Sequence, residues 1–198
     1  MKTQRFPFVL VGSTALMTVL TGCSTLSALN DVSIPLEVYE LRAPESIALS
    51  IEQQMPVDVI IELPTTSGAL STDRIMIRPN ALQAQYLPDV RWGDPTPVML
   101  QTLMLRAVEA TNAVRYVGRQ PLASNGDFAV VTELVDFQAE LAEDGQTTIA
   151  QLKIIVRVVR EIDANILASK TFTASVPAAT TQNEAIATAL SDASTAPA

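Results

Sequence analysis

Alternating apolar and polar residues predict strands along most of the chain beyond residue 35. The expected strands are residues 36–41, 55–63, 74–78, 82–87, 113–117, 128–141, 150–158 and 166–176. The third and fourth flank a Pro-Asn turn, which predicts a hairpin. The last three are long and joined by short turns, so we expect an antiparallel meander. Residues 128–141 begin apolar on both faces, which indicates a central strand.

Two segments repeat their apolar residues at helical spacing. The first begins near Pro97 and ends near Asn112, and Asp94 is placed to cap it. The second opens with Thr181-Gln182-Asn183-Glu184, which matches a capping box. The apolar positions of the first helix are Leu100, Leu103, Met104, Ala107 and Val108. Those of the second helix are Ala185, Ile186, Ala189 and Leu190. Residues 65–68 and 89–97 are expected to lack regular structure.

This order of elements predicts an α+β fold, in which two helices pack on one face of an antiparallel β-sheet meander. The chain then divides into four parts. They are a lipoprotein signal peptide (1–22), an acylated N-terminus with a tether (23–35), the folded domain (36–190) and a frayed tail (191–198).

The first 22 residues have the pattern of a lipoprotein signal peptide. Lys2 and Arg5 precede an uncharged, mostly apolar run, which ends in Leu20-Thr21-Gly22-Cys23. An apolar residue, two small residues and a cysteine form a lipobox, so cleavage before Cys23 is expected to leave Cys23 as the acylated N-terminus, with palmitate among its acyl groups. The alternatives are an ordinary signal peptide with a chance cysteine, or an N-terminal anchor helix. Ser24 favours the periplasmic face of the outer membrane, with inner-membrane anchoring as the alternative.

Composition excludes several functions. With 198 residues, 48% hydrophobic and 17% charged, the chain has enough apolar surface to fold. A net charge of −8 argues against a nucleic-acid partner. The absence of histidine excludes His-dependent catalysis and His metal sites, and a single cysteine excludes intrachain disulfides and Cys-cluster metal sites. We therefore expect no metal or cofactor.

The charged residues of the sequence do not indicate an active site. The acids considered are Asp127, Glu133, Asp136 and Glu140, and the arginines are Arg74, Arg78, Arg91 and Arg119. Glu133 and Asp136 lie three apart on a strand and are expected on opposite faces, so they cannot form a carboxylate pair. One interpretation of the arginines is a site for an anionic headgroup. The preferred interpretation is that they lie at strand edges and prevent sheet-to-sheet aggregation. An enzyme is not expected.

The segment Gln85–Asp94 is the most distinctive internal feature, because it concentrates Tyr86, Arg91 and Trp92, the sole tryptophan. One interpretation is a partner-binding loop, since these residue types are enriched at binding hot spots. The alternative is a structural corner, in which Trp92 fills the space between helix and sheet while Arg91 pairs with an acid. A lone tryptophan is more often buried, which favours the corner.

These residues resemble the ABC-type transport auxiliary lipoprotein component family, which includes the PqiC lipoproteins. The resemblance covers about residues 36–190 and is carried by Cys23, Tyr39–Pro44, Asp73-Arg74-Ile75, Arg78-Pro79, Gln85–Asp94 with the helix from Pro97, and Glu133–Ala139. The chain departs from the family at its end, where a longer last helix is usual. The resemblance implies a periplasmic, non-enzymatic lipoprotein that works beside an ABC permease and ATPase and a mammalian-cell-entry (MCE) substrate-binding protein, moving phospholipids or other hydrophobic molecules and maintaining the envelope.

Three hypotheses follow. The leading one is a membrane-tethered adaptor that docks on the MCE component. The second is a carrier domain that holds an acyl chain between sheet and helices. The third is a scaffold lipoprotein for cell-wall or secretion machinery, with homo-oligomerisation possible.

Overall fold

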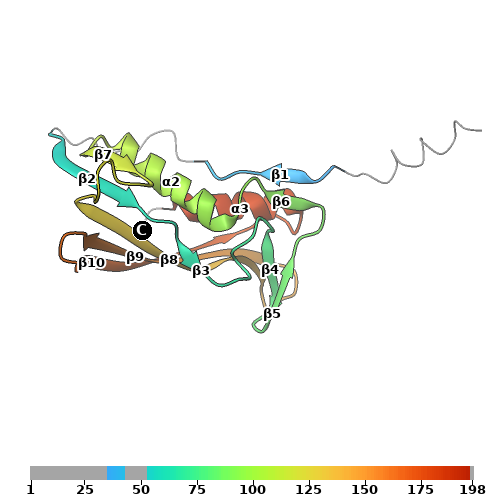
Figure 1. Ribbon diagram of the computed structural model, residues 1–198. Helices are drawn as coiled ribbons and strands as arrows, with labels where there is room; N and C mark the ends of the chain where they lie inside the picture. Colours follow the sequence, from blue (N-terminus) through green and yellow to red (C-terminus); the bar gives the residue numbers. More distant parts are fainter. Residues whose placement is uncertain (1–34, 43–52, 197–198) are drawn as a thin grey trace, which may run out of the picture. The chain divides into compact units, whose positions relative to one another are not determined.

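The computed structural model describes residues 35–42 and 53–196 (Figure 1). The predicted signal peptide, Cys23 and the tether up to residue 34 lie outside these residues. The unit Leu36–Ala198 contains β1 (Glu37–Tyr39), β2 (Met55–Ile61), β3 (Thr65–Thr66), β4 (Met76–Asn80), β5 (Gln83–Tyr86), β6 (Val90–Trp92), α2 (Thr96–Ala110), β7 (Val114–Gly118), β8 (Phe128–Leu141), β9 (Thr148–Arg160), β10 (Asn165–Pro177) and α3 (Asn183–Thr195).

Strand β8 lies at the centre of the main sheet, which has eight strands. One edge of β8 pairs with β9 in antiparallel fashion along its whole length, and β9 pairs with β10 in the same way. The other edge of β8 pairs in turn with β2, β3 and β4. These pairings confirm the central strand, the meander of β8, β9 and β10, and the hairpin of β4 and β5.

The sheet is mixed, so the prediction of an antiparallel sheet holds only in part. Strands β2, β3 and β4 run parallel to β8, and β7 runs parallel to β2. Parallel neighbours require a crossover connection, and the segment between β2 and β7 supplies one that contains α2. Alternation along a single strand is the same in either direction, so the sequence pattern did not distinguish the two arrangements.

Two segments expected to be irregular form short strands. Thr65–Thr66 pairs with β8, and Val90–Trp92 forms β6, which pairs in parallel with β1 as a separate two-stranded sheet. The backbone of a distant segment supplies the hydrogen bonds in each case. A strand of two or three residues is too short to show a period, so neither was visible in the pattern.

A β-bulge at Val135 changes which faces the residues of β8 occupy. Leu134 pairs with Ile154 and Asp136 with Lys153, so Val135 is the extra residue. Leu134 and Phe137 are consequently both buried in the core although they are three apart. Glu133 and Asp136 therefore share the opposite face, and the prediction that they lie on opposite faces was wrong.

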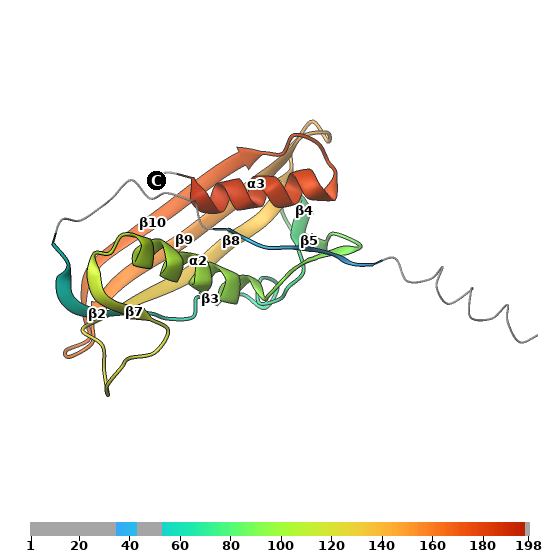
Figure 2. The same cartoon turned by 90° about the horizontal axis from the view of Figure 1, so that it is seen from above.

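Helices α2 and α3 lie over the same face of the sheet, as predicted (Figure 2). The core between these layers is a single apolar cluster from both helices, the facing side of β8 and β9, and the segments around β4 and β6. Helix α3 extends to Thr195, with Ala193 buried, so the helix enters the segment expected to be a frayed tail.

Neither helix has the predicted side-chain cap. Helix α2 has Pro95 as its N-cap residue instead of Asp94. Its first amide, that of Thr96, donates to the carbonyl of Thr72, and Pro97 has no amide to satisfy. Helix α3 has Gln182 at its N-cap instead of Thr181, and the Gln182 amide donates to Thr180 Oγ1. Contacts outside each helix thus replace the expected caps.

The packing of the core predicts that two leucines contribute very differently to the free energy of unfolding. Leu190 of α3 is 0% exposed, whereas Leu82, between β4 and β5, is 97% exposed. We expect Leu190→Ala to lower the free energy of unfolding by about 2–5 kcal/mol, and Leu82→Ala to change it by less than about 0.5 kcal/mol. Urea denaturation followed by circular dichroism measures both. Equal effects would contradict the packing of α3 on the sheet.

Candidate functional site

The conspicuous segment of the sequence forms a corner, defined here as residues 72–75 and 86–96, where several elements meet. The Trp92 amide donates to the Asp73 carbonyl at 2.7 Å, and the Leu87 amide to that of Ile75 at 2.9 Å. The Gly93 amide donates to Tyr39 of β1 at 2.8 Å. Backbone hydrogen bonds therefore fix the course of this segment into α2.

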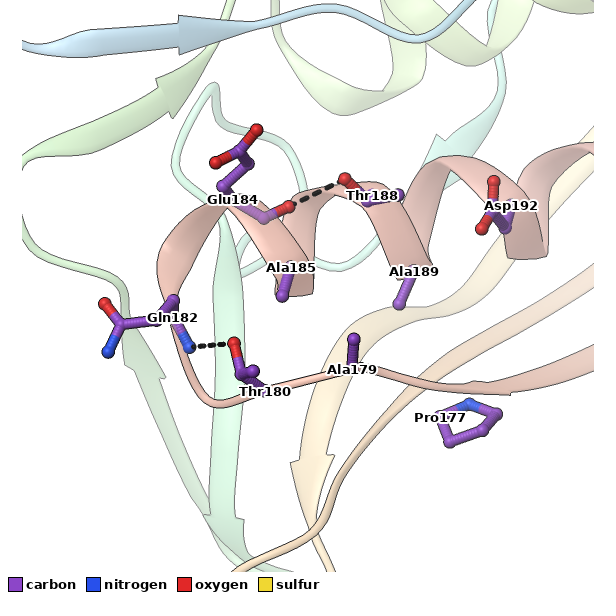
Figure 3. Close-up of a pocket in the computed structure, with 9 residues that line it drawn as sticks. All are labelled: Pro177, Ala179, Thr180, Gln182, Glu184, Ala185, Thr188, Ala189 and Asp192. Carbon is purple, nitrogen blue, oxygen red and sulfur yellow. Dashed lines mark hydrogen bonds between the residues drawn. The ribbon is translucent and has the colours of Figure 1, made fainter.

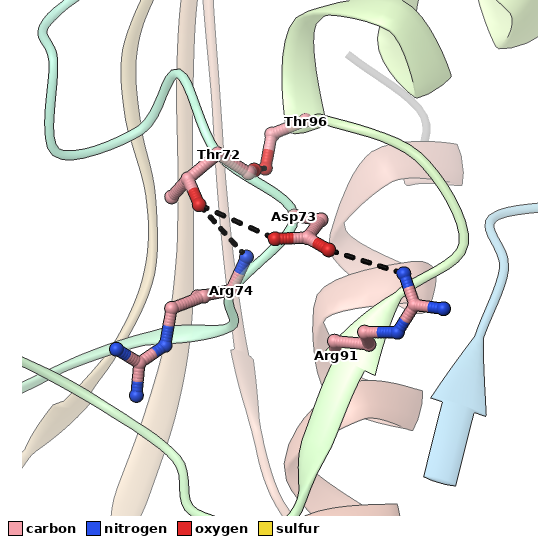
Figure 4. Close-up of polar contacts among 5 residues, drawn as sticks. All are labelled: Thr72, Asp73, Arg74, Arg91 and Thr96. Carbon is pink, nitrogen blue, oxygen red and sulfur yellow. Dashed lines mark hydrogen bonds and ion pairs between the residues drawn. The ribbon is translucent and has the colours of Figure 1, made fainter. Parts of the chain in front are cut away.

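Side chains reinforce the corner (Figure 4). Arg91 Nη1 donates to Asp73 Oδ2 at 3.1 Å, in an ion pair whose side chains are 41% and 37% exposed. The Arg74 guanidinium points away from this pair and lies 4.6 Å from the ring centroid of Tyr86. The Tyr86 hydroxyl donates to the Ala69 carbonyl at 3.1 Å. Arg91, Arg74 and Tyr86 are thus each held by a specific contact.

Trp92 lies in the core and is only 2% exposed. Its ring centroid lies 5.7 Å from that of Phe137, with the planes tilted by 32°. This is the position that the structural interpretation predicts, with Arg91 paired to an acid as expected. The indole is not available to a partner in this structure. A binding role for Tyr86, which is half-buried, and for Arg91 stays a prediction.

Tyr39 extends the corner to β1. Burial raises the pKa of its phenol, and the Glu37 carboxylate, which accepts a hydrogen bond from the hydroxyl at 2.9 Å, raises it further, with smaller effects from the charges of Glu37 and Glu184. The phenol therefore stays protonated at neutral pH and acts as a donor.

Four other charged candidates contact groups outside the corner. Arg119 donates to Gln101 and Thr102 of α2, so it is not grouped with the corner arginines. Glu133 lies 3.8 Å from Arg157. Asp136 and Glu140 both accept from Gln138 Nε2. Within residues 35–42 and 53–196, no group of His, Cys, Asp or Glu is arranged to hold a metal ion.

A shallow pocket of about 420 Å³ lies between α3 and the segment that leads into it (Figure 3). Its polar side chains include Gln182, Glu184 and Asp192, and all three are exposed. Thr188 Oγ1 donates to the carbonyl of Glu184 within the helix. A pocket whose polar groups are already solvated offers little for ligand recognition.

An apolar groove of about 440 Å³ lies between the sheet and the helices. Its floor includes Val156, Val158 and Phe172, and its walls include Ala107 of α2 and Ala193 of α3. Among the described residues, no charged side chain lines it. The floor residues belong to the strands predicted over residues 150–158 and 166–176, but the sequence pattern does not indicate that the helices cover them incompletely. Neither α2 nor α3 is long and apolar enough to cross a bilayer.

Comparisons with known proteins identify the sequence family and the fold. The family described as ABC-type transport auxiliary lipoprotein component matches residues 39–198. No curated protein matches the chain.

Protein XCC0632 from Xanthomonas campestris, of family DUF330, is 22% identical with a TM-score of 0.70, over 80% of this chain and 87% of that one. A second crystal structure, of an uncharacterized protein, is 12% identical with a TM-score of 0.59, over 80% of this chain and 90% of that one. At these identities the likeness shows the fold alone.

The corner yields a prediction about stability. Trp92→Ala removes a buried ring that contacts Phe137, so we expect a loss of about 3–5 kcal/mol in the free energy of unfolding. Arg91→Gln removes an exposed ion pair and is expected to cost no more than about 1 kcal/mol. Chemical denaturation followed by circular dichroism distinguishes the two. A Trp92→Ala variant as stable as the wild type would show that the indole does not stabilise the core.

Proposed function

Because this chain belongs to the ABC-type transport auxiliary lipoprotein component family, we propose that it is the membrane-anchored adaptor of an ABC transport system. In this proposal the adaptor docks on an MCE-domain substrate-binding protein, and the system moves phospholipids or other hydrophobic molecules across the envelope. The observation that carries the proposal is the extent of the family match, which begins at Tyr39 in β1 and runs through α3. ATP hydrolysis belongs to the partner ATPase, and this chain performs no catalysis.

The anchor is the acylated Cys23, on the periplasmic face of the outer membrane. Each buried methylene of an acyl chain contributes about 0.8 kcal/mol, so more than one chain holds a protein stably at a bilayer without a spanning helix. Support comes from the lipobox Leu20–Cys23 and from the lipoprotein family. Ser24, in place of an acidic residue, supports the outer membrane over the inner.

The docking surface is the solvent side of the corner together with the tip between β4 and β5. Leu82 at this tip is 97% exposed and offers an apolar side chain to a partner. At the corner, Arg74 is exposed just before β4 begins, and the Arg91 side chain is 41% exposed. An exposed leucine and exposed guanidinium groups spread over one end of the domain fit a protein contact better than a small-molecule site.

Acylation predicts a labelling pattern. In cells fed an alkyne analogue of palmitate, the wild-type chain should be labelled and Cys23→Ser should not, because the thiol is the acyl acceptor. Ser24→Ala is the matched control and should keep the label. Ser24→Asp should also keep it but move the protein to the inner-membrane fraction. A labelled Cys23→Ser variant would contradict the anchor.

Docking predicts which proteins copurify. Affinity purification from native membranes through a C-terminal tag should recover an MCE-domain protein with its permease and ATPase. Leu82→Asp combined with Arg91→Gln should reduce this recovery at least fivefold, because it removes an apolar contact and a charge. The matched control is Leu122→Asp, which alters a leucine that is 70% exposed in the loop between β7 and β8, at the other end of the sheet (Figure 2).

Other outcomes distinguish the alternatives. If the double variant recovered the MCE-domain protein as well as the wild type does, the corner would have only a structural role. Recovery of only cell-wall or secretion components would contradict the adaptor and favour the scaffold hypothesis.

A further inference from the structure

We propose that the apolar groove between α2, the end of α3 and strands β8–β10 binds the acyl chain of a long-chain fatty acid, whose carboxylate is held at the rim by Lys170. The groove shares no residue with the docking surface defined above. The two proposals therefore stand or fall independently.

The lining fits a hydrocarbon chain. Its volume of about 440 Å³ lies within the range of small-molecule pockets, which are mostly apolar. The only polar side chains among the described lining residues are the hydroxyls of Thr173 and Ser194. Water in such a groove forms few hydrogen bonds with its walls, so its replacement by methylene groups is favourable.

The groove exists at this place because α3 ends before it covers the whole inward face of β9. The inward residues of β9 are buried at Ala150 and Leu152, where α3 covers them. Farther along the strand, Val156 and Val158 remain half-buried although they point to the same side. Helix α3 ends at Thr195, and the residues it contributes near this end are small. The apolar floor of the sheet thus continues beyond the helix that covers it.

Lys170 places one positive charge at the rim. It pairs in register with Val156 and lies two residues before Phe172 on β10, so it occupies the same face as these two lining residues. Its Nζ lies 4.7 Å from the ring centroid of Phe172. In the described part of the chain Lys170 forms no ion pair, and its side chain is exposed. The ammonium is therefore free to bind an anion there.

A single groove beside Lys170 favours a single-chain monoanion. Arg160 lies two residues beyond Val158 on the same face of β9, but its guanidinium is already paired with Asp163 at 3.0 Å. A phospholipid would bring a second acyl chain for which the groove has no counterpart, and a neutral alcohol would leave the ammonium unused. The carboxylate of a fatty acid accepts hydrogen bonds from an ammonium, while its chain follows Phe172 into the groove.

The experiment is displacement of cis-parinaric acid from the mature chain, residues 23–198, with Cys23→Ser so that the protein has no acyl group of its own. Laurate, myristate and palmitate should displace the probe with affinities that rise roughly 15-fold per pair of added methylenes until the groove is full. Lys170→Gln should weaken palmitate about fivefold and leave the uncharged hexadecanol unchanged. Lys153→Gln, which removes the same charge from the opposite face of β9, should change neither.

A second pair of variants tests the groove itself. Ala107→Trp should fill it and abolish binding of palmitate and hexadecanol alike, whereas Ala110→Trp, at an exposed position of α2 outside the lining, should preserve binding. Thermal unfolding confirms that each variant is folded. Absence of saturable binding, or binding that Ala107→Trp leaves unchanged, would overturn the proposal. Uptake of phosphatidylglycerol from vesicles without binding of palmitate would also overturn it, in favour of a two-chain lipid.

Discussion

Backbone pairing along both edges of β8 is the interaction on which the remaining structure depends. One edge bonds β9 over the full length of the strand, and the other bonds three short strands one after another. None of those short strands has enough residues to be stable alone, so the position of each depends on its pairing with β8. The bulge at Val135 lets the strand keep apolar residues on the core side through both halves, and this curls the sheet around the helices.

The two ends of the helical layer differ in how completely they cover the sheet. At the corner, Trp92 and Phe137 fill the space, and backbone hydrogen bonds join β1, β6 and the start of α2. Toward the end of α3, small side chains such as Ala193 replace large ones, and half-buried valines form the floor. A rigid end and an incompletely covered end thus coexist in one domain, and they suit different roles.

The elements predicted most accurately from the sequence were those with a long repeat of apolar positions. The meander and both helices were read from repeated apolar positions, and Trp92 was correctly favoured as a buried corner. The parallel pairing of β2, the strand β6 and the bulge at Val135 were not predictable, because each depends on a backbone segment distant in the sequence. The groove was missed for a related reason. Periodicity shows which face of β9 points inward, but it does not show where the covering helix stops.

The position of β8 late in the chain has a consequence for how the protein is made. Residues of β2 pair with β8 partners about seventy positions later, as Val59 does with Phe128. Chains with such distant contacts fold slowly, since a long loop must close before any pairing stabilises it. Because synthesis proceeds from the N-terminus, β2, β3 and β4 emerge before the strand that organises them. Every newly made molecule therefore passes through an interval in which these partly apolar strands lack their β8 partner, when protection from aggregation matters most.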